Sequence, residues 1–331
     1  MDKTIAKKIK LGFYAITLTI FLTGIFFVAS CSPSPVQEGV LDPSDHLQKE
    51  SPSNLFPVEV EDYLNKKITI NTPPETIISL VPAHTEILFA LGLGENLIGV
   101  TDYCDYPPEA LDIEKIGGFS DPSLEKIISL NPDLVIGNIL NFGTLEALNQ
   151  AGIPALAFEP HSFAQIFADI KTIGAVTGKS KEAEELSAAI KKDYEEIKAK
   201  IATIPVEERP SVFFEIWHDP LTTVGPDTFL YEILEIAAGK VVSSPGGDRY
   251  PLFSLEKLIE EDPDFYFATA GSMSDFTDLQ KRPGWEVLSA VKNNKVHIIS
   301  DENIIYRGGP RIIEGLKEIT GVLYPDLFGK E

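Results

Sequence analysis

From residue 76 onward, short apolar runs rich in β-branched residues alternate with stretches in which apolar positions recur at helical spacing. The short runs predict eight strands: TIISLV (76–81), LIGVT (97–101), DLVIGN (133–138), ALAF (155–158), SVFFEIW (211–217), VVS (241–243), DFYFATA (264–270) and VHIIS (296–300). Strands that alternate with helices favour parallel pairing. The pattern therefore predicts an α/β fold with mainly parallel central sheets.

A long helix is predicted between the fourth and fifth strands. The segment SKEAEELSAAIKKDYEEIKAKIATI (180–204) has apolar residues at helical spacing and contains neither Gly nor Pro. Its glutamates are concentrated early and its lysines late, which is the order that the helix macrodipole favours. We expect this helix to be stiff.

An internal repeat divides the chain on either side of that helix. SLEKIISLNPDLV (123–135) and SLEKLIEEDPDFY (254–266) agree at seven of thirteen positions, 131 residues apart. Each copy opens with a serine suited to an N-cap and continues through Pro-Asp into a strand. Each is also preceded by a strand, a loop with a histidine, and a helix that ends in glycine. The repeat predicts two related lobes joined by the long helix.

The first thirty residues are expected to lie outside the fold. A basic head, MDKTIAKKIK, precedes the apolar run LGFYAITLTIFLTGIFFVAS, which predicts a secretory signal peptide. The ending VASC resembles the lipobox of bacterial lipoproteins, and this resemblance implies that Cys31 is lipidated after cleavage. An uncleaved transmembrane anchor is the alternative, because the run is about long enough to span a bilayer. Both predict an extracytoplasmic protein held at a membrane, at the cell surface or in the periplasm.

The predicted organisation has five segments. A stretch rich in Ser, Pro, Asp and Glu follows Cys31 and predicts a flexible tether, with a short strand near VEVEDYLNKKITI (58–70). The segments are the signal peptide (1–30), the lipidated cysteine and tether (31–67), the N-terminal lobe (68–179), the linking helix (180–204) and the C-terminal lobe (205–331).

Charge and cysteine content narrow the possible partners. The formal net charge is −22, and removal of residues 1–30, with four lysines and one aspartate, takes it to −25. Such an excess of acid disfavours nucleic acid and anionic lipid as partners. Cys104 is the only cysteine besides Cys31, so the mature domain forms no intramolecular disulfide and depends on core burial.

The loops that follow the predicted strands are the candidate site, because ligands of open parallel sheets bind at the carboxyl ends of the strands. One wall would contain PAH (82–84), DYCDY (102–106), GGF (117–119) and GNILN (137–141), and the other WHDP (217–220), GGDRY (246–250) and NIIYRGG (303–309). Their aromatic residues suit a large, partly apolar ligand: Tyr103, Tyr106, Phe119, Trp217, Tyr250 and Tyr306. The alternative is that these rings pack between sheet and helix.

His84 admits more than one role. His84, His161 and His218 each follow a predicted strand, and Glu159 and Asp219 lie nearby, which makes a zinc or manganese site one hypothesis. Capping or loop hydrogen bonding is the other, since no HxxxH, CxxC or His-rich loop is present. The sequence also contains no GxSxG, GxxxxGK[ST] or HExxH motif, so we do not expect an enzyme.

Four longer segments resemble a known family. They are ISLVPAHTEILFALGLGENLIGVTDYCDYPPEA, IGGFSDPSLEKIISLNPDLVIG, YPLFSLEKLIEEDPDFYFA and YRGGPRIIEGL. Together they resemble the class III, helical-backbone substrate-binding proteins of ABC importers, most closely the cobalamin-binding branch. The resemblance implies two α/β lobes on one long helix, a monomer without a resident cofactor, and a corrinoid as transported ligand. Its partners would be a permease and an ATPase. A receptor for an iron-siderophore or haem is the first alternative, and a zinc or manganese receptor the second.

The resemblance also assigns residues. Pro82, Ala83, His84, Tyr103, Phe119, Tyr250 and Arg307 match its ligand contacts, Asn138 stands where a tryptophan is expected, and Trp217, His218 and Tyr306 depend on the cleft argument. The histidine at position 84 would contact the ligand or coordinate a metal carried inside it. Glu125 and Glu256, in the two SLEK copies, match the glutamates that dock on the permease. The alternative is that both are solvated glutamates favoured by the helix dipole.

Overall fold

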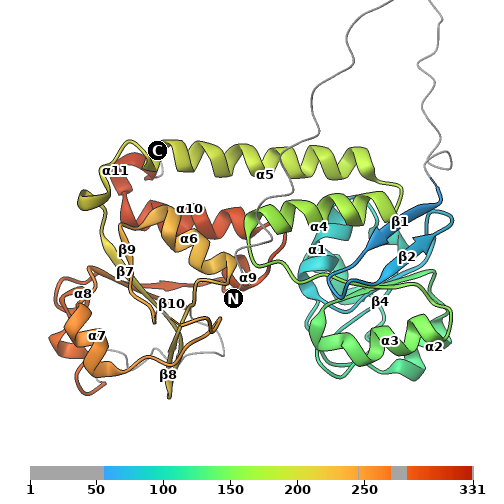
Figure 1. Ribbon diagram of the computed structural model, residues 1–331, viewed down its shortest axis with the longest axis horizontal. Coiled ribbons are helices and arrows are strands. Elements are labelled where there is room, and N and C mark those ends of the chain that lie inside the picture. The colour runs from blue at the N-terminus through green and yellow to red at the C-terminus, as the bar shows by residue number, and fades with distance from the viewer. Residues whose placement is uncertain (1–55, 245, 270–281, 330–331) are drawn as a thin grey trace, which may run out of the picture. The chain divides into compact units, whose positions relative to one another are not determined.

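Two parallel sheets form the framework of the protein (Figure 1). The computed structural model describes residues 56–244, 246–269 and 282–329, which belong to one compact unit, Glu50–Glu331. The predicted signal peptide, Cys31 and the tether up to residue 55 lie outside the described residues. In the part of the chain that is described, no helix is long and apolar enough to cross a membrane.

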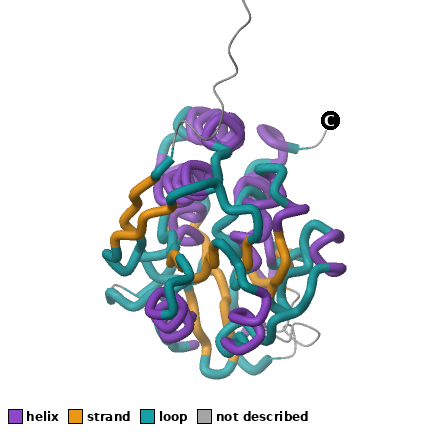
Figure 2. Tube along the Cα trace, turned by 90° about the vertical axis from the view of Figure 1, so that its right-hand side faces the viewer, coloured by secondary structure: helices purple, strands orange, loops and turns teal. Residues whose placement is uncertain are grey.

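The sheet of the N-terminal lobe has the strand order β4-β3-β5-β6, and every pair is parallel. Its strands are β3 (Ile77–Ser79), β4 (Leu97–Val100), β5 (Leu134–Gly137) and β6 (Ala155–Ala157). The helices of this lobe are α1 (Pro82–Ala90), α2 (Leu124–Leu130), α3 (Phe142–Gln150) and α4 (Phe163–Val176). The four strands confirm the predicted runs, and Figure 2 shows strands with helices above and below them.

Alternate side chains of these strands enter different cores, as expected for strands buried on both faces. Ile77, Leu134 and Ile136 pack in the core that also contains residues of α1 and α4. Ile78 and Val135 pack in a second core with residues of α2 and α3. The near-continuous apolar runs in the sequence follow from this burial on two sides.

The sheet of the C-terminal lobe repeats this arrangement and adds a hairpin. The parallel strands β7 (Ser211–His218), β9 (Lys240–Val241), β10 (Phe265–Thr269) and β11 (Val296–Ile299) pair in the order β11-β10-β7, with β9 also on β7. Strand β8 (Leu221–Thr223), which the sequence pattern did not predict, pairs with β7 in the antiparallel direction. The helices of this lobe are α6 (Phe229–Ala237), α7 (Leu255–Glu261), α8 (Ser289–Lys292), α9 (Asn303–Tyr306), α10 (Ile312–Leu323) and α11 (Pro325–Phe328).

Helix α5 (Ser180–Ile201) joins the two lobes, as the fold prediction required (Figure 1). Ile190, Tyr194 and Ile197 on its buried face belong to a single apolar core that includes strands from both sheets. Tyr194 also donates a hydrogen bond to Oε1 of Glu232 in α6, and Oε2 of Glu232 accepts from the first backbone N–H of α4. One continuous core and these polar contacts hold α5 against both lobes.

The internal repeat is also a repeat of hydrogen bonds. Ser123 and Ser254 cap α2 and α7 by accepting the backbone N–H of the residue three positions later. Both helices end on a residue in the left-handed conformation, with φ of 51° and 40°. Asp133 then accepts hydrogen bonds from the backbone and hydroxyl of Thr76 at 2.9 and 2.8 Å, and Asp264 accepts the same pair from Ser211, both at 2.8 Å. In each copy, the aspartate of Pro-Asp therefore connects the start of its own strand to the start of the neighbouring strand.

A hairpin precedes the N-terminal lobe. Strands β1 (Val58–Glu61) and β2 (Lys67–Ile70) pair antiparallel, in the region where the sequence pattern predicted one short strand. The hairpin is fixed to β6, because the backbone of Tyr63 donates to Ala157 and Asp62 accepts from the backbone of Ala157. This hairpin therefore places secondary structure in the last part of the segment that was predicted to be the tether (31–67).

Candidate functional site

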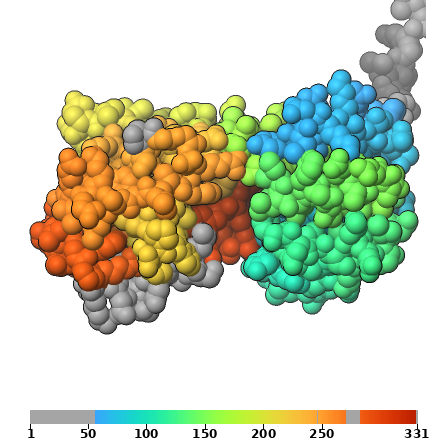
Figure 3. Space-filling view, turned by 60° about the horizontal axis from the view of Figure 1, so that its bottom comes forward, coloured from blue at the N-terminus to red at the C-terminus, as the bar shows by residue number. Residues whose placement is uncertain are grey.

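A cavity of about 640 Å³ lies between the two lobes. Figure 3 shows the hollow between the green residues of the N-terminal lobe and the yellow and orange residues of the C-terminal lobe. Residues that follow β3, β4, β5 and β6 line one side, and residues from the start of α6 and from α9 and its flanks line the other. The site therefore occupies the carboxyl ends of parallel strands, where open sheets bind ligands.

The first wall is built at the end of β3. Pro82 occupies the first turn of α1, where it needs no hydrogen-bonded N–H, and places Ala83 and His84 against the cavity. The Thr85 hydroxyl donates to Ser79 at 2.9 Å and to the sulfur of Cys104 at 3.1 Å. The buried Cys104 therefore holds the loop that carries Tyr103 against the start of α1. This contact gives the free thiol a structural role.

Tyr103 and Phe119 form an aromatic corner of this wall. Their ring centroids are 6.4 Å apart with an interplanar angle of 75°, and Tyr103 exposes 62% of its surface. Nearby, Asp121 lies over Gly118, where a Cβ would come within 2.2 Å of Oδ1 of Asp121. A larger residue at position 118 would therefore displace the carboxylate of Asp121 from this position.

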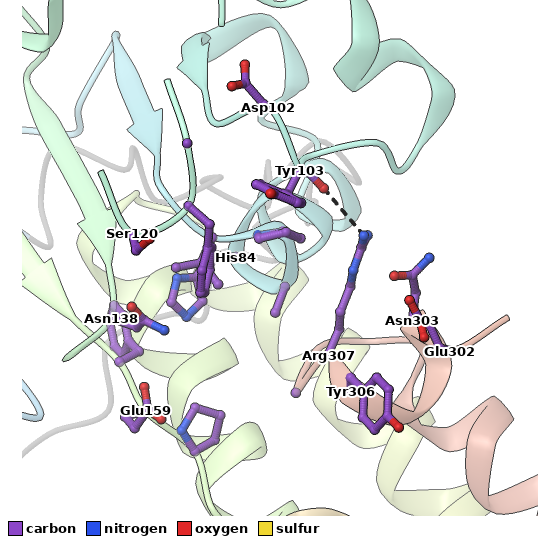
Figure 4. Close-up of a pocket in the computed structure, with 18 of the residues that line it drawn as sticks. His84, Asp102, Tyr103, Ser120, Asn138, Glu159, Glu302, Asn303, Tyr306 and Arg307 are labelled. Atoms are coloured by element: carbon purple, nitrogen blue, oxygen red, sulfur yellow. Dashed lines mark hydrogen bonds between the residues drawn. The ribbon is translucent and has the colours of Figure 1, made fainter. Parts of the chain in front are cut away.

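Asn138 follows β5 and keeps part of its hydrogen-bonding capacity. Its Oδ1 accepts the backbone N–H of Leu140 at 3.1 Å, which caps the turn after the strand. The nitrogen of its side-chain amide has no partner among the described residues, and the side chain lines the cavity (Figure 4). Asn138 therefore offers an N–H donor where the resemblance predicted an aromatic ring.

His84 lies deep in the cavity wall. It is 2% exposed and its ring meets Phe158 edge-on, with centroids 5.5 Å apart. Burial lowers the pKa of His84 to about 3, so the imidazole is uncharged at physiological pH. Its Nδ1 is buried and has no hydrogen-bond partner in the described part of the chain. A histidine that binds a metal usually donates its second N–H to an acceptor, and no residue of the described ranges accepts from this nitrogen.

The opposite wall is formed by Glu302, Asn303, Tyr306 and Arg307 (Figure 4). Arg307 donates to Oε1 of Glu86 at 3.0 Å, to Asp105 at 2.7 Å and to the carbonyl oxygen of Tyr103 at 3.4 Å. Burial opposes its charge, but the hydrogen bonds to Asp105 and Glu86 outweigh burial and raise the pKa of Arg307. The arginine predicted to face the ligand lines the cavity with its charge already paired.

Glu86 was not predicted as a site residue, yet it joins the two walls. It is 3% exposed and accepts hydrogen bonds from Arg307 and, through both oxygens, from Arg311. Arg311 also bonds to Asp301 and lies over the ring of Tyr106, 3.8 Å from its centroid. No local pattern signals this contact, because more than 220 residues separate Glu86 from its partners.

A second ionic contact joins the lobes at Glu159. Arg249 donates to Oε1 of Glu159 at 2.9 Å and lies 3.7 Å from Asp227. Asp227 in turn contacts His161 at 3.1 Å, and His161 lies 3.5 Å from the Tyr63 hydroxyl. Glu159 lines the cavity, whereas His161 does not.

The structure brings most of the predicted ligand contacts to one cavity. The lining includes Pro82, Ala83, His84, Tyr103, Phe119, Asn138, Tyr306 and Arg307. It does not include Trp217, His218 or Tyr250. Trp217 and His218 lie where β7 turns into β8, and Tyr250 is half exposed next to Arg249. The lining residues that the sequence did not single out as ligand contacts include Asp102, Asp121, Phe158, Glu159, Phe229 and Glu302.

The histidines of the metal hypothesis have separate surroundings. His84 lies in the cavity wall, His161 contacts Asp227, and His218 packs against Trp217 with ring centroids 5.3 Å apart. Within residues 56–244, 246–269 and 282–329, no group of three or more His, Cys, Asp or Glu side chains is placed to share an ion.

The protein has two α/β lobes with parallel sheets, one helix that connects them and a cavity between them. This is the architecture of a two-lobed solute-binding protein. The family model described as periplasmic binding protein matches residues 77–302, and the chain therefore belongs to the periplasmic binding protein family. This membership confirms the expected fold and the expectation of a binding protein in place of an enzyme.

Individual relatives agree with this placement. The chain is 35% identical over 293 residues to an uncharacterized ABC transporter substrate-binding lipoprotein, YvrC of Bacillus subtilis, covering 87% of this chain and 91% of YvrC. It is 34% identical over 209 residues to a vitamin B12-binding protein of Vibrio campbellii, covering 62% of this chain and 74% of that protein. The solved structure of the haem-binding protein RhuT from Roseiflexus is 27% identical, with a TM-score of 0.67 over 76% of this chain and 98% of RhuT.

Proposed function

We propose that this protein is the substrate-binding component of an ABC importer and that it captures cobalamin or a related corrinoid between its lobes. The similarity to YvrC supports the transporter assignment, and the similarity to a vitamin B12-binding protein supports the ligand class. The eight predicted residues that line the cavity are its proposed ligand contacts. The protein would hold the corrinoid as cargo, with no resident cofactor.

The lining of the cavity carries the ligand proposal. Tyr103, Phe119, Phe158, Phe229 and Tyr306 supply aromatic surface, and Asn138 supplies an amide donor. Arg307, the positively charged residue in this lining, is already paired with Glu86 and Asp105. A corrinoid presents a broad apolar macrocycle with neutral amides on its periphery, which aromatic contacts and neutral donors suit.

Haem is the second candidate, because the chain resembles a haem-binding protein of known structure. Haem carries two propionate groups, and their binding would need cations that are free to pair with them. In the described lining, Arg307 would have to leave Glu86 and Asp105 to do so. An iron-siderophore receptor and then a zinc or manganese receptor follow as weaker alternatives.

A ligand panel separates these classes. The purified protein without residues 1–30 is titrated with cyanocobalamin, haemin and a ferric hydroxamate siderophore, followed by calorimetry and by the visible spectrum of each ligand. We expect corrinoid binding that neither haemin nor the siderophore displaces. Tight haemin binding without corrinoid binding would assign the protein to the haem class, and stoichiometric zinc or manganese in the untreated protein would support a metal receptor.

The partners and location follow from the proposed transport role. Cys31 would carry the lipid that holds the protein outside the cytoplasm, and the following tether would let it reach the permease and its ATPase. Glu125 and Glu256 would dock on the permease, one per lobe. Both lie exposed in the first turn of equivalent helices, and neither forms an ion pair within the described residues. Two equivalent acidic contacts suit a two-fold permease and a monomeric receptor.

A further inference from the structure

The cavity between the lobes carries carboxylates that form no ion pair with any side chain in the described part of the protein. Asp102 and Asp121 line it from the N-terminal lobe, both exposed and without an ionic partner in the described residues. Glu302 lines it from the C-terminal lobe, and the partner of its carboxylate is the hydroxyl of Thr269 at 3.2 Å. Figure 4 shows Asp102 at the upper edge and Glu302 beside Tyr306 on the facing wall. The negative charge is therefore contributed by both lobes.

Among the described residues, the positive groups near the cavity do not offset these three carboxylates. Arg307 is paired with Glu86 and Asp105, and Arg249 is paired with Glu159. The imidazole of His84 is uncharged, because burial lowers its pKa to about 3. The excess of acid in the whole chain, with a formal charge of −22, adds to a negative potential in the cleft.

Corrinoids differ in charge in a way that such a cavity can detect. The corrin ring carries one negative charge and encloses trivalent cobalt, so a complex with one cyanide and one water is a cation. Cyanocobalamin has the same macrocycle but also a nucleotide loop whose phosphate cancels that charge. Removal of the nucleotide loop, as in cyanoaquacobinamide, leaves the net positive charge in place.

We propose that the cavity selects corrinoids with a net positive charge, and that it therefore binds cyanoaquacobinamide more tightly than cyanocobalamin. The inference rests on the proposed function, because it concerns the choice among corrinoids at the same site. Asp102, Asp121 and Glu302 are the residues that determine this specificity. They act through the electrostatic field at the cavity and do not coordinate the cobalt of the ligand.

The size of the effect follows from the exposure of these groups. An exposed ionic contact changes an equilibrium by about 1.5- to 5-fold, and a less exposed group such as Glu302 lies at the upper end of that range. Three carboxylates together should therefore favour cobinamide by about tenfold at low ionic strength. Salt should reduce the preference, because the Debye length falls from about 30 Å at 0.01 M to about 3 Å at 1 M.

The test compares cyanoaquacobinamide with cyanocobalamin by competition for the protein without residues 1–30, at about 20 mM and about 500 mM salt. The Asp102→Asn/Asp121→Asn/Glu302→Gln variant should lose most of the preference for cobinamide. A control, Glu95→Gln/Glu109→Gln/Asp112→Asn, removes three exposed carboxylates that line a different cavity and should keep the preference. Circular dichroism verifies that both variants fold.

The outcomes distinguish this inference from the proposed function. Failure of the natural sequence to bind either corrinoid would remove the proposed function and the inference with it. Binding of both corrinoids with equal affinity, or a preference that salt and the triple variant leave unchanged, would overturn only the charge selection. A preference that survives the triple variant and shifts the cobinamide spectrum would assign the discrimination to coordination by His84. If the triple variant does not fold, the salt dependence of the natural protein still decides between these results.

Discussion

Arg311, the residue immediately before α10, donates to both carboxylate oxygens of Glu86 in α1, from Nε to Oε2 at 3.0 Å and from Nη2 to Oε1 at 2.8 Å. Arg307 adds a bond to Oε1 at 3.0 Å. Glu86 is almost fully buried, so its charge depends on these two arginines. The contact joins the lobes next to the cavity and thereby sets how the two walls face each other.

Removal of the Glu86 charge should destabilise the protein. Glu86→Gln keeps the shape of the side chain but removes the negative charge that pairs with Arg307 and Arg311. We expect the free energy of unfolding to fall by about 3 kcal/mol, measured by urea denaturation.

The control is Asp301→Asn, which removes the other carboxylate bound by Arg311. Because the side chain of Asp301 is 45% exposed, this change should reduce the free energy of unfolding by less than about 1 kcal/mol. Equal losses in the two variants would contradict the importance of the buried contact.

Asp169 in α4 should make stability fall as pH rises. Burial and the neighbouring charge of Glu159 raise the pKa of this carboxyl group to about 7, and its Oδ2 has no partner in the described part of the chain. In the unfolded chain its pKa is about 3.9, so between these values the folded protein binds more protons. The contribution of Asp169 to the free energy of unfolding is therefore full below about pH 4 and is lost as pH rises through about 7.

Asp169→Asn removes this titration. The variant should gain stability relative to the natural sequence as pH rises from about 5 to about 8, by about 1 to 3 kcal/mol in urea unfolding. Asp133→Asn is the control, and its effect on stability should not change with pH over this range, because the contribution of a carboxyl group with a lowered pKa is already complete above the unfolded pKa of about 3.9. Burial opposes the shift at Asp133, but hydrogen bonds from Thr76 and Glu75 outweigh it and lower the pKa of Asp133. A stability difference for Asp169→Asn that does not change with pH would contradict the raised pKa.

The aromatic corner should supply ligand affinity. Tyr103 lines the cavity with most of its ring exposed, and a bound macrocycle would cover it. Tyr103→Ala should weaken corrinoid binding by about tenfold or more, measured by calorimetry, because the buried aromatic area and ring contacts are lost. Tyr250→Ala is the matched comparison, since Tyr250 lies outside the cavity lining, and its effect should be smaller. A larger loss for Tyr250→Ala would move the ligand toward the loop that carries Tyr250.

Docking and ligand binding should be separable. Glu125→Ala with Glu256→Ala should leave corrinoid affinity intact and lower uptake in cells that depend on this receptor, because the two glutamates lie on α2 and α7 and not in the cavity. Glu146→Ala with Glu314→Ala removes two exposed glutamates elsewhere and should leave uptake unchanged. Normal uptake by the Glu125 and Glu256 variant would remove the docking assignment.

The framework could be predicted because it depends on local patterns. The alternation of Ile77 and Ile78, or of Val135 and Ile136, reflects burial on both faces of a sheet, and each short apolar run became a strand. The SLEK repeat carries its own caps at Ser123 and Ser254, so its two copies form equivalent helices. Loops that follow such strands meet at one edge of a sheet, and for this reason the cavity collects residues from distant segments.

The ionic contacts between the lobes could not be predicted. Glu86 and Arg311 are 225 positions apart, and Glu159 and Arg249 are 90 apart, so no local spacing relates them. Trp217 and His218 were placed on a cleft wall because they end a strand, but the unexpected antiparallel strand β8 turns that strand end into a hairpin. The exposure of Tyr103 and the burial of His84 also depend on tertiary packing.

The most direct test of the account is a calorimetric titration of the protein with cyanocobalamin, with the visible spectrum of the corrinoid recorded in parallel. The account predicts one corrinoid per chain with a Kd of about 1 μM or lower, and competition by cobinamide for the same site. No heat and no spectral change at corrinoid concentrations of about 100 μM would contradict the proposal that the cavity between the lobes is a corrinoid site.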